Sequence, residues 1–407
     1  MPRFVKEYIG RNVVDEAKDR FRRYYEEFDF VSVSFSGGKD SLACMYLAHD
    51  VAVEEGYTDK VHTLFLDEEV IHADVLDFVA TFKDLPWVDL HWWCTPLRSH
   101  KMTLGVISDY VQWDPERDPS EGGVGWVRPK PPWAYTREDL IDQIAAWQEV
   151  TKQPVDPHNA VLSQYAASEV ESMAHKGRYM QVCGMRTTES LLRYAMISSS
   201  GLKPSECHIG MPTLGRVYLG KPIYDWTEND VFKYLHEKFE EGLCPSPHPY
   251  APIYDGQLYS KLGFRVGTAL TSEAAGRLDR LRTSDPDLYE AVQRIFPDMT
   301  VHERYNKEFI TDVDRMRASG ELERATYATV QAWIDLELEG KWHTQATTML
   351  RRLQNRPESY PPAYVMQHMV NGAYKRMYLG PDPKSARPNR AWVNGKYVDV
   401  DKEGVPV

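Results

Sequence analysis

The sequence has few cysteines and lacks long apolar runs. Its five cysteines are scattered along 407 residues without a C-x-x-C pair, so we expect neither a disulfide framework nor a zinc ribbon. No window approaches eighteen consecutive apolar residues, and residues 1–11 have no apolar core of signal-peptide length. We therefore expect a cytoplasmic protein that is not secreted and does not span a membrane.

Positive charge is also in short supply. The chain has 48 Lys and Arg against 60 Asp and Glu, a net charge of −12. This balance argues against a protein that coats nucleic acid through broad electrostatics, although it leaves a local basic groove open. With 42% hydrophobic and 27% charged residues, the composition is that of a globular protein, and the length suits two domains or one large α/β domain with additions.

The most informative stretch joins an expected strand to an expected helix. Residues 30–35 alternate apolar residues with serine, and residues 39–55 have apolar residues at helical spacing. Between them lies Ser36-Gly37-Gly38-Lys39-Asp40-Ser41. Glycines let a ligand approach the main chain, and the N–H groups and dipole of the helix start favour an anion. We expect this loop to bind phosphate; the alternative is an ordinary strand-to-helix turn.

Acidic residues follow a second expected strand, at 61–66. They are Asp67-Glu68-Glu69, and they lie where α/β sheets bind ligands, at the carboxyl end of a strand. Contact with magnesium or ribose is one interpretation, and the acidic first turn of the next helix is the other.

A third strand is expected at 88–94, followed by a tryptophan-rich insertion at about 99–157 with a helix near 137–150. Aromatic and basic residues alternate at Trp126-Val127-Arg128-Pro129-Lys130. These residues could stack on a base, but tryptophans of this kind more often pack against the protein.

The strand and helix pattern resumes with a helix at 160–175 and a strand at 179–183. Gly184-Met185-Arg186 follows, and Arg186, Glu189 and Arg193 fall on one helical face. Such arginines suit a multidentate grip on phosphate or sulfate, whereas a solvated salt-bridge face is the plainer interpretation. Thr227 and Asp230 resemble a helix start.

The pattern divides the chain into three parts. Residues 1–265 form an α/β domain with a doubly wound, mainly parallel sheet, and its last part, 242–265, is a loop in which His248, Lys261 and Arg265 are candidate ligand contacts. Residues 266–380 are mainly helical and form a C-terminal domain. Residues 381–407 are expected to be a loosely structured tail.

Three motifs together resemble a known family. They are Ser36 to Ser41, Gly184-Met185-Arg186 through Arg193, and Pro222-Ile223-Tyr224-Asp225-Trp226-Thr227. In this order they resemble the phosphoadenosine phosphosulfate (PAPS) reductase family, within the adenine nucleotide α-hydrolase or ATP pyrophosphatase (PP-loop) superfamily. The tryptophan-rich insertion resembles an IbrA-like co-activator branch, whose members often occur with a ParB-like partner.

The resemblance implies an adenine nucleotide, ATP or PAPS, with Mg²⁺. It implies that the Ser36 to Ser41 loop holds the terminal phosphates, and that Ser34, Phe35 and Asp67 at the strand ends receive adenine and ribose. Arg186 and Arg193 would contact the phosphate or sulfate end of the ligand, and Glu189 would belong to the same binding site. Lys39, Asp40 and Arg186 would be the catalytic residues. The metal ligands would be Asp40 and Asp67.

One departure from the family separates the functional hypotheses. PAPS reductases share a C-terminal Glu-Cys-Gly-Leu-His element whose cysteine attacks sulfur, and nothing here matches it. Our first hypothesis is therefore a transferase that cleaves ATP to AMP and pyrophosphate. A second keeps a sulfonucleotide, with Cys244 or Cys183 as the thiol. A third is a non-catalytic nucleotide sensor that acts with a ParB-like partner or nucleic acid.

Overall fold

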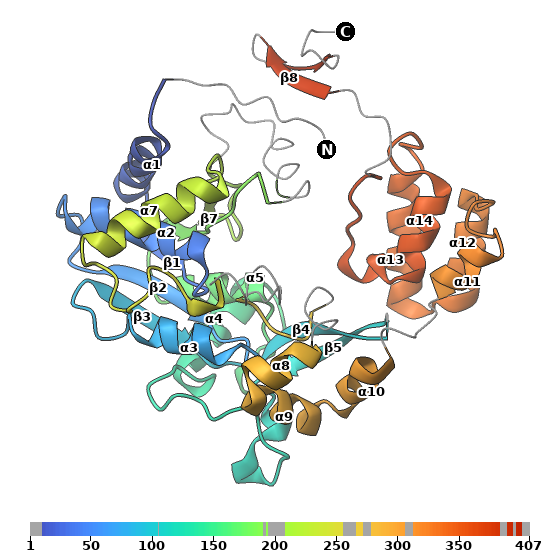
Figure 1. Cartoon of the computed structure of the whole chain (residues 1–407), viewed down its shortest axis with the longest axis horizontal. Helices are drawn as coiled ribbons and strands as arrows, with labels where there is room; N and C mark the ends of the chain where they lie inside the picture. The colour runs from blue at the N-terminus through green and yellow to red at the C-terminus, as the bar shows by residue number, and fades with distance from the viewer. Residues whose placement is uncertain are drawn as a thin grey trace. The chain divides into compact units, whose positions relative to one another are not determined.

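The computed structural model describes residues 10–104, 106–189, 193, 208–254, 266–271, 278–305, 312–382, 389–393 and 396–400. The chain divides into two compact units (Figure 1). One contains Arg11–Met102 and Ser108–Arg304, and the other contains Tyr305–Val407 with Met1–Gly10 and Thr103–Ile107. Within the described ranges, no helix is both long and apolar enough to cross a bilayer.

A parallel sheet of five strands lies at the centre of the first unit. The strand order is β3-β2-β1-β6-β7, and the paired neighbours run parallel. The α/β class with a mainly parallel, doubly wound sheet is confirmed. The strands are β1 (Phe30–Ser34), β2 (Val61–Leu66), β3 (Val88–Trp93), β6 (Tyr179–Val182) and β7 (Val217–Gly220).

The strand order reverses beside β1. From β1 the chain moves outward through β2 to β3, and it then returns to the other side of β1 with β6. Loops that follow β1 and β6 therefore diverge at the carboxyl end of the sheet, which is where open α/β sheets bind ligands.

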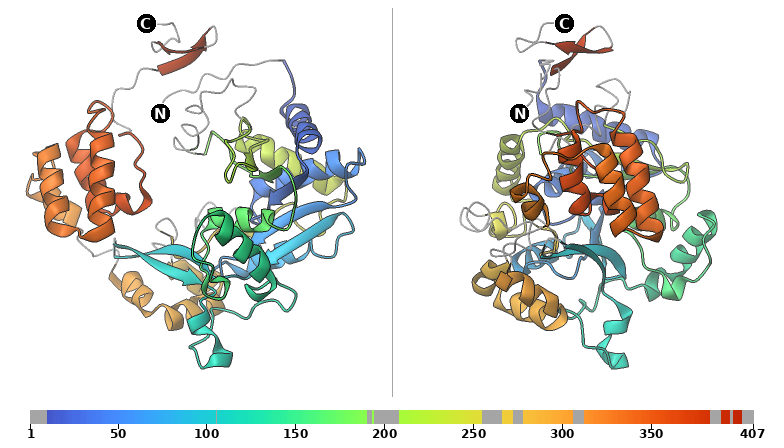
Figure 2. Two further views of the ribbon diagram at one scale, coloured as in Figure 1. Left: turned by 180° about the vertical axis from the view of Figure 1, so that it is seen from behind. Right: turned by 90° about the vertical axis from the view of Figure 1, so that its right-hand side faces the viewer.

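Two sets of helices cover the two faces of the sheet. Apolar side chains from alternate positions, such as Val33, Phe65 and Val182, pack with one set. On the other face, Leu64 and Trp93 pack with the second set, which Figure 2 shows from behind. The first set is α1 (Val13–Glu27), α2 (Lys39–Ala48), α3 (Ala73–Ala80) and α7 (Glu228–Glu240); the second is α4 (Ile141–Val150) and α5 (Gln164–Ser172).

Two helix starts show why these segments fold as they do. The Asn12 side chain accepts a hydrogen bond from the Val14 N–H at the start of α1. Thr227 and Asp230 form a reciprocal capping box at the start of α7, as their spacing predicted. The helix that follows β1 ends in a π-helical turn, His49–Val53.

The insertion contains an expected helix and an unexpected hairpin. The helix is α4, and the hairpin pairs β4 (Leu97–Thr103) with β5 (Val106–Gln112). Trp113 is fully buried, and its ring meets that of Trp126 edge to face at 6.0 Å. Arg128 and Lys130 lie over these rings. The packing interpretation of these tryptophans is therefore the correct one in this structure.

The helical unit begins later than the expected boundary at 266. Helices α8 (Leu278–Ser284), α9 (Pro286–Ile295) and α10 (Pro297–Tyr305) contribute Leu281, Val292 and Met299 to the core of the sheet unit. Helical periodicity shows which face is apolar but not which core that face joins. The second unit has its own core, formed by α11 (Asp312–Ala318), α12 (Tyr327–Glu337), α13 (Gly340–Leu353) and α14 (Pro362–Val370).

The tail also differs from expectation. Residues 381–407 were expected to be loosely structured, but β8 (Asn389–Val393) and β9 (Lys396–Val400) form an antiparallel pair. The two runs flank Asn394-Gly395 in the sequence, a dipeptide that favours tight hairpin turns. Within the described residues, the tail therefore contains this pair of strands.

Candidate functional site

The loop between β1 and α2 is folded tightly on itself. Gly37 has a φ of +73°, and a Cβ there would lie 2.7 Å from Val79 Cγ2, so a larger residue does not fit without displacing α3. The Ser41 hydroxyl accepts from the Ser36 N–H at 3.1 Å and donates to the Gly38 carbonyl at 2.9 Å. These bonds hold the start of α2 beside the end of β1.

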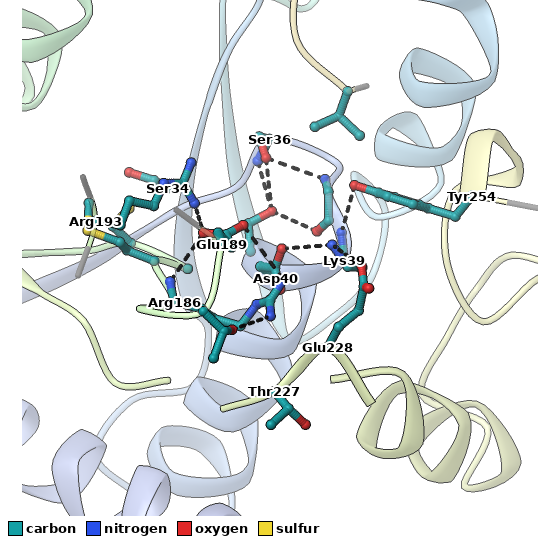
Figure 3. A pocket seen from close by; sticks show the side chains of 17 residues that line it. Ser34, Ser36, Lys39, Asp40, Arg186, Glu189, Arg193, Thr227, Glu228 and Tyr254 are labelled. Carbon is teal, nitrogen blue, oxygen red and sulfur yellow. Dashed lines mark hydrogen bonds and ion pairs between the residues drawn. The ribbon is translucent and has the colours of Figure 1, made fainter. Parts of the chain in front are cut away.

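A pocket of about 1080 Å³ opens at this loop, at the point where the strand order reverses (Figure 3). One wall comes from the loop and the first turn of α2. The facing wall comes from the residues that follow β6, and the start of α7, Tyr254 and Val266 complete the described lining. The lining includes the predicted residues Ser34, Ser36, Gly38, Lys39, Asp40, Ser41, Arg186, Glu189 and Arg193.

The charges in the pocket are paired in this structure. Arg186 Nε donates to Asp40 Oδ1 at 2.6 Å, and Lys39 Nζ lies 3.1 Å from Asp40 Oδ2. Arg193 pairs with Glu189, and Lys39 also lies 3.4 Å from Glu228. The described lining thus has three cations and three carboxylates. An anionic ligand can bind by replacing carboxylates as the partners of these cations.

A glycine lets the two walls approach each other. A Cβ at Gly184 would lie 2.6 Å from the Asp40 carbonyl carbon and 2.7 Å from the Ser41 nitrogen. Only a residue without a side chain allows the segment after β6 to pass this close to α2. This close contact places Arg186, two residues later, against Asp40.

The segment after β6 is held by the 222–227 motif. The Thr187 N–H donates to the Tyr224 carbonyl at 2.8 Å. That motif is anchored in turn, because Arg20 of α1 makes two bonds of 2.8 Å to the Asp225 carboxylate. The motif therefore positions the Arg186 segment. Of its residues, 222–226 are not among the described lining of the pocket, whereas Thr227 is.

Tyr254 is a lining residue that the sequence analysis missed. The Lys39 N–H, at the start of α2, donates to its hydroxyl at 3.3 Å, and Lys39 Nζ lies 5.3 Å from the centre of its ring. Thr227 and Glu228 were missed as lining residues as well. The aromatic stretch around Tyr254 was the available signal, since it belongs to the 242–265 loop that was expected to supply ligand contacts.

Asp67 lies at the end of β2, but its side chain does not line the pocket. The carboxylate is fully buried, paired with Arg128 and bonded to Trp92 Nε1 at 2.7 Å. A pairing of Asp40 with Asp67 as magnesium ligands does not match this arrangement. Phe35, which is buried, and Gly37 are also outside the lining.

The neighbouring acidic residues are occupied by contacts within the protein, and Glu69 holds the insertion. Glu69 accepts two bonds of 2.7 Å from Arg117, and Glu68 accepts from the Thr268 N–H at 2.7 Å. Burial raises the pKa of Glu68. Helix α3 begins only at Ala73, so the first-turn interpretation of Asp67-Glu68-Glu69 is wrong, and the metal or ribose interpretation does not match these contacts.

The two candidate thiols differ in position. Cys183 lines the pocket, and burial raises its pKa, so its resting form is the thiol. Cys244 is not among the described lining residues; its Sγ donates to the His248 carbonyl, and burial raises its pKa as well. Lys261 and Arg265 lie outside the described residues.

Comparison with known proteins gives distant similarities. No family model matches the chain. An uncharacterized protein of Escherichia coli (strain K12), YbdN, is 25% identical over 240 residues, or 57% of this chain and 53% of YbdN. The chain thus matches about half the length of this relative.

Two solved structures are similar at 13% sequence identity. A PAPS reductase from Candida auris, in a phosphate complex, has a TM-score of 0.29 over 59% of this chain and 84% of the reductase. An FMN adenylyltransferase from Candida glabrata, in complex with FAD and pyrophosphate, has a TM-score of 0.32 over 60% and 58%. The α/β fold of this chain is therefore assigned from its own five-stranded parallel sheet and not from these two similarities.

Proposed function

We propose that this chain is a PP-loop protein of the PAPS reductase type that binds an adenine nucleotide in the pocket after β1. The observation that carries the proposal is the pocket's position: a glycine-rich loop and a helix start face Arg186 and Arg193 at the strand-order reversal. Backbone N–H groups and planar guanidinium groups are the donors that phosphates accept best. The loop motif and the IbrA-like insertion support the same assignment.

The favoured reaction is cleavage of ATP to AMP and pyrophosphate. Water attacks the α-phosphorus and loses a proton to solvent, the bond from that phosphorus to the oxygen bridging to the β-phosphate breaks, and pyrophosphate leaves from the Ser36 to Ser41 loop. An acceptor nucleophile in place of water would keep the adenylyl group, which a later hydrolysis would release as AMP. Lys39 and Arg186 neutralise the developing charge, while the loop holds the leaving group in position. A sulfonucleotide such as PAPS is the other candidate substrate, with Cys183 as the thiol that lines the pocket.

Asp40 would hold Mg²⁺ in this site. Magnesium binds one or two carboxylates together with substrate phosphates, and Asp40 is the loop carboxylate whose partners, Lys39 and Arg186, can move to phosphate. The ion would supply charge neutralisation at the phosphates.

The test is phosphorus NMR of the purified chain with ATP and, separately, with PAPS, with and without Mg²⁺. We expect AMP and pyrophosphate from ATP, or adenosine bisphosphate from PAPS. Lys39→Ala combined with Arg186→Ala removes two charge-assisted contacts worth about 1.5–3 kcal/mol each, so nucleotide affinity should fall at least about 100-fold.

The matched control removes the same charge from exposed ion pairs, with Lys233→Ala and Arg315→Ala. Unchanged product formation in the pocket double variant would sink the proposal, as would a wild-type chain that binds neither nucleotide. Binding without turnover would instead support a nucleotide sensor that acts with a ParB-like partner or DNA.

A further inference from the structure

A cluster of polar side chains lies on the sheet face that α5 covers, away from the pocket. His62 of β2, His91 of β3 and Glu171 of α5 each place one nitrogen or oxygen within 4.8 Å of the others. His62 and Glu171 are buried, and His91 is partly exposed. Two imidazoles and one carboxylate are a donor set that suits Zn²⁺ and not Mg²⁺.

We propose that His62, His91 and Glu171 bind a Zn²⁺ ion that joins β2, β3 and α5. In the structure, His62 Nε2 lies 2.8 Å from Glu171 Oε1, and the rings of His62 and His91 are 4.2 Å apart. A tetrahedral ion with bonds of about 2.0–2.1 Å needs donor atoms about 3.3 Å apart. Small side-chain movements bring the three donors to that spacing.

Two of the three donors, His62 and Glu171, have outer hydrogen-bond partners that fix their orientation. His62 Nδ1 lies 3.0 Å from Asp89 Oδ2, so its N–H can donate to Asp89 while Nε2 faces the ion. Glu171 Oε2 accepts from Ser32 Oγ at 3.2 Å and from the Tyr179 hydroxyl, which leaves Oε1 for the metal. A histidine backed by a carboxylate is a recurring feature of zinc sites.

The cluster is also accessible. The side chain of Asp89 is 48% exposed and that of His91 is 26% exposed, so an ion can enter between them. The His91 ring is held from the other side by stacking on Tyr135 at 4.9 Å. The exposed side leaves room for water as the fourth ligand. When zinc binds, His62 Nε2 gives up its proton to solvent, and the bond to Glu171 is replaced by two bonds to the metal.

Hydrogen bonds connect this cluster with the nucleotide pocket. Tyr179 and Gln181 lie on the same face of β6, and the Tyr179 hydroxyl lies 3.4 Å from the side-chain amide oxygen of Gln181, Oε1, to which it can donate. Gln181 Nε2 donates to Ser34 Oγ at 2.7 Å, and Ser34 lines the pocket. The zinc site therefore supports the strand ends that carry the loop, but its binding test does not depend on nucleotide.

The test is a zinc titration of the full chain after removal of metal with a chelator, with metal content measured by plasma mass spectrometry. We expect one Zn²⁺ per chain, bound at micromolar concentration or tighter, and a higher melting temperature with zinc. His91→Asn and Glu171→Gln should each weaken binding at least about 100-fold, because each removes a ligand. His100→Asn, at an exposed histidine paired with Asp109, should leave binding unchanged.

Cobalt substitution gives an answer that does not depend on variants folding. Co²⁺ in the wild-type chain should show the visible absorption of a tetrahedral nitrogen and oxygen site, without a thiolate charge-transfer band. A thiolate band would place the metal at cysteine and overturn the proposal. Failure to bind zinc at micromolar concentration, or equal binding in the wild type and in His91→Asn, would overturn it as well.

Discussion

The close approach at Gly184 predicts that a single methyl group will separate the two walls of the pocket. In Gly184→Ala the new Cβ would meet the backbone of Asp40 and Ser41 at 2.6–2.7 Å, and backbone atoms cannot move aside as a flexible side chain can. Overpacking of this kind costs about 1–3 kcal/mol. We expect the melting temperature to fall by roughly 2–4 °C for each kcal/mol.

The same displacement moves Arg186 away from Asp40. We therefore expect ATP binding to weaken about tenfold, which corresponds to about 1.4 kcal/mol, as measured by calorimetric titration. Gly210→Ala is the matched control, because the new Cβ would lie 3.4 Å from its nearest neighbour, the Leu219 carbonyl oxygen. The free energy of unfolding of this variant should change by less than about 0.5 kcal/mol. If Gly184→Ala kept the melting temperature and the affinity of the wild type, the steric reasoning would be refuted.

Two further predictions concern buried titratable groups. Burial, together with nearby arginines, lowers the pKa of His208 to about 4. In the unfolded chain the same imidazole has a pKa near 6.5, so it binds a proton more readily there than in the folded protein. The free energy of unfolding should therefore be at its full value above pH 6.5 and fall by about 3 kcal/mol towards pH 4. Urea unfolding at pH 7 and pH 5 checks this, and His208→Gln should reduce the loss. The Asp50 carboxylate is fully buried and accepts a hydrogen bond of 2.8 Å from Lys238, so Asp50→Asn should lower the free energy of unfolding by about 3–5 kcal/mol. Asp109→Asn, at an exposed ion pair, should lower it by less than about 1 kcal/mol. An equal effect of the two substitutions in urea unfolding would contradict this.

Local patterns were sufficient to predict the loop and four of the five strands, but not β7 at Val217–Gly220. The strand, glycine turn and helix around Ser36 to Ser41 are neighbours in sequence, so periodicity and turn chemistry describe them well. The same is true of the capping box at Thr227. Asp40 and Arg186, which meet across the strand-order reversal, could be placed near each other because each follows a strand of the same sheet.

The failures involve contacts between distant segments. Asp67 was placed correctly at the end of a strand, but its partner Arg128 lies 61 residues later, and no local pattern reveals that pairing. Tyr254 meets Lys39 across 215 residues. The polar cluster around His62 was missed for a related reason, since it forms only when α5 covers two strands that lie far from it in sequence.

The contact between Asp40 and Arg186 spans 146 residues, and this separation bears on how the protein is made. A chain leaving the ribosome carries the glycine loop long before β6 has been synthesised to pair with β1. The long segment between the two strands must be closed, at a cost in chain entropy, before the stabilising contacts between them can form. The loop alone has no facing arginine and no pocket. A nucleotide that binds in this pocket, as proposed above, would recognise only a chain whose central strands have already paired, and its binding energy would stabilise that pairing and no earlier stage of folding.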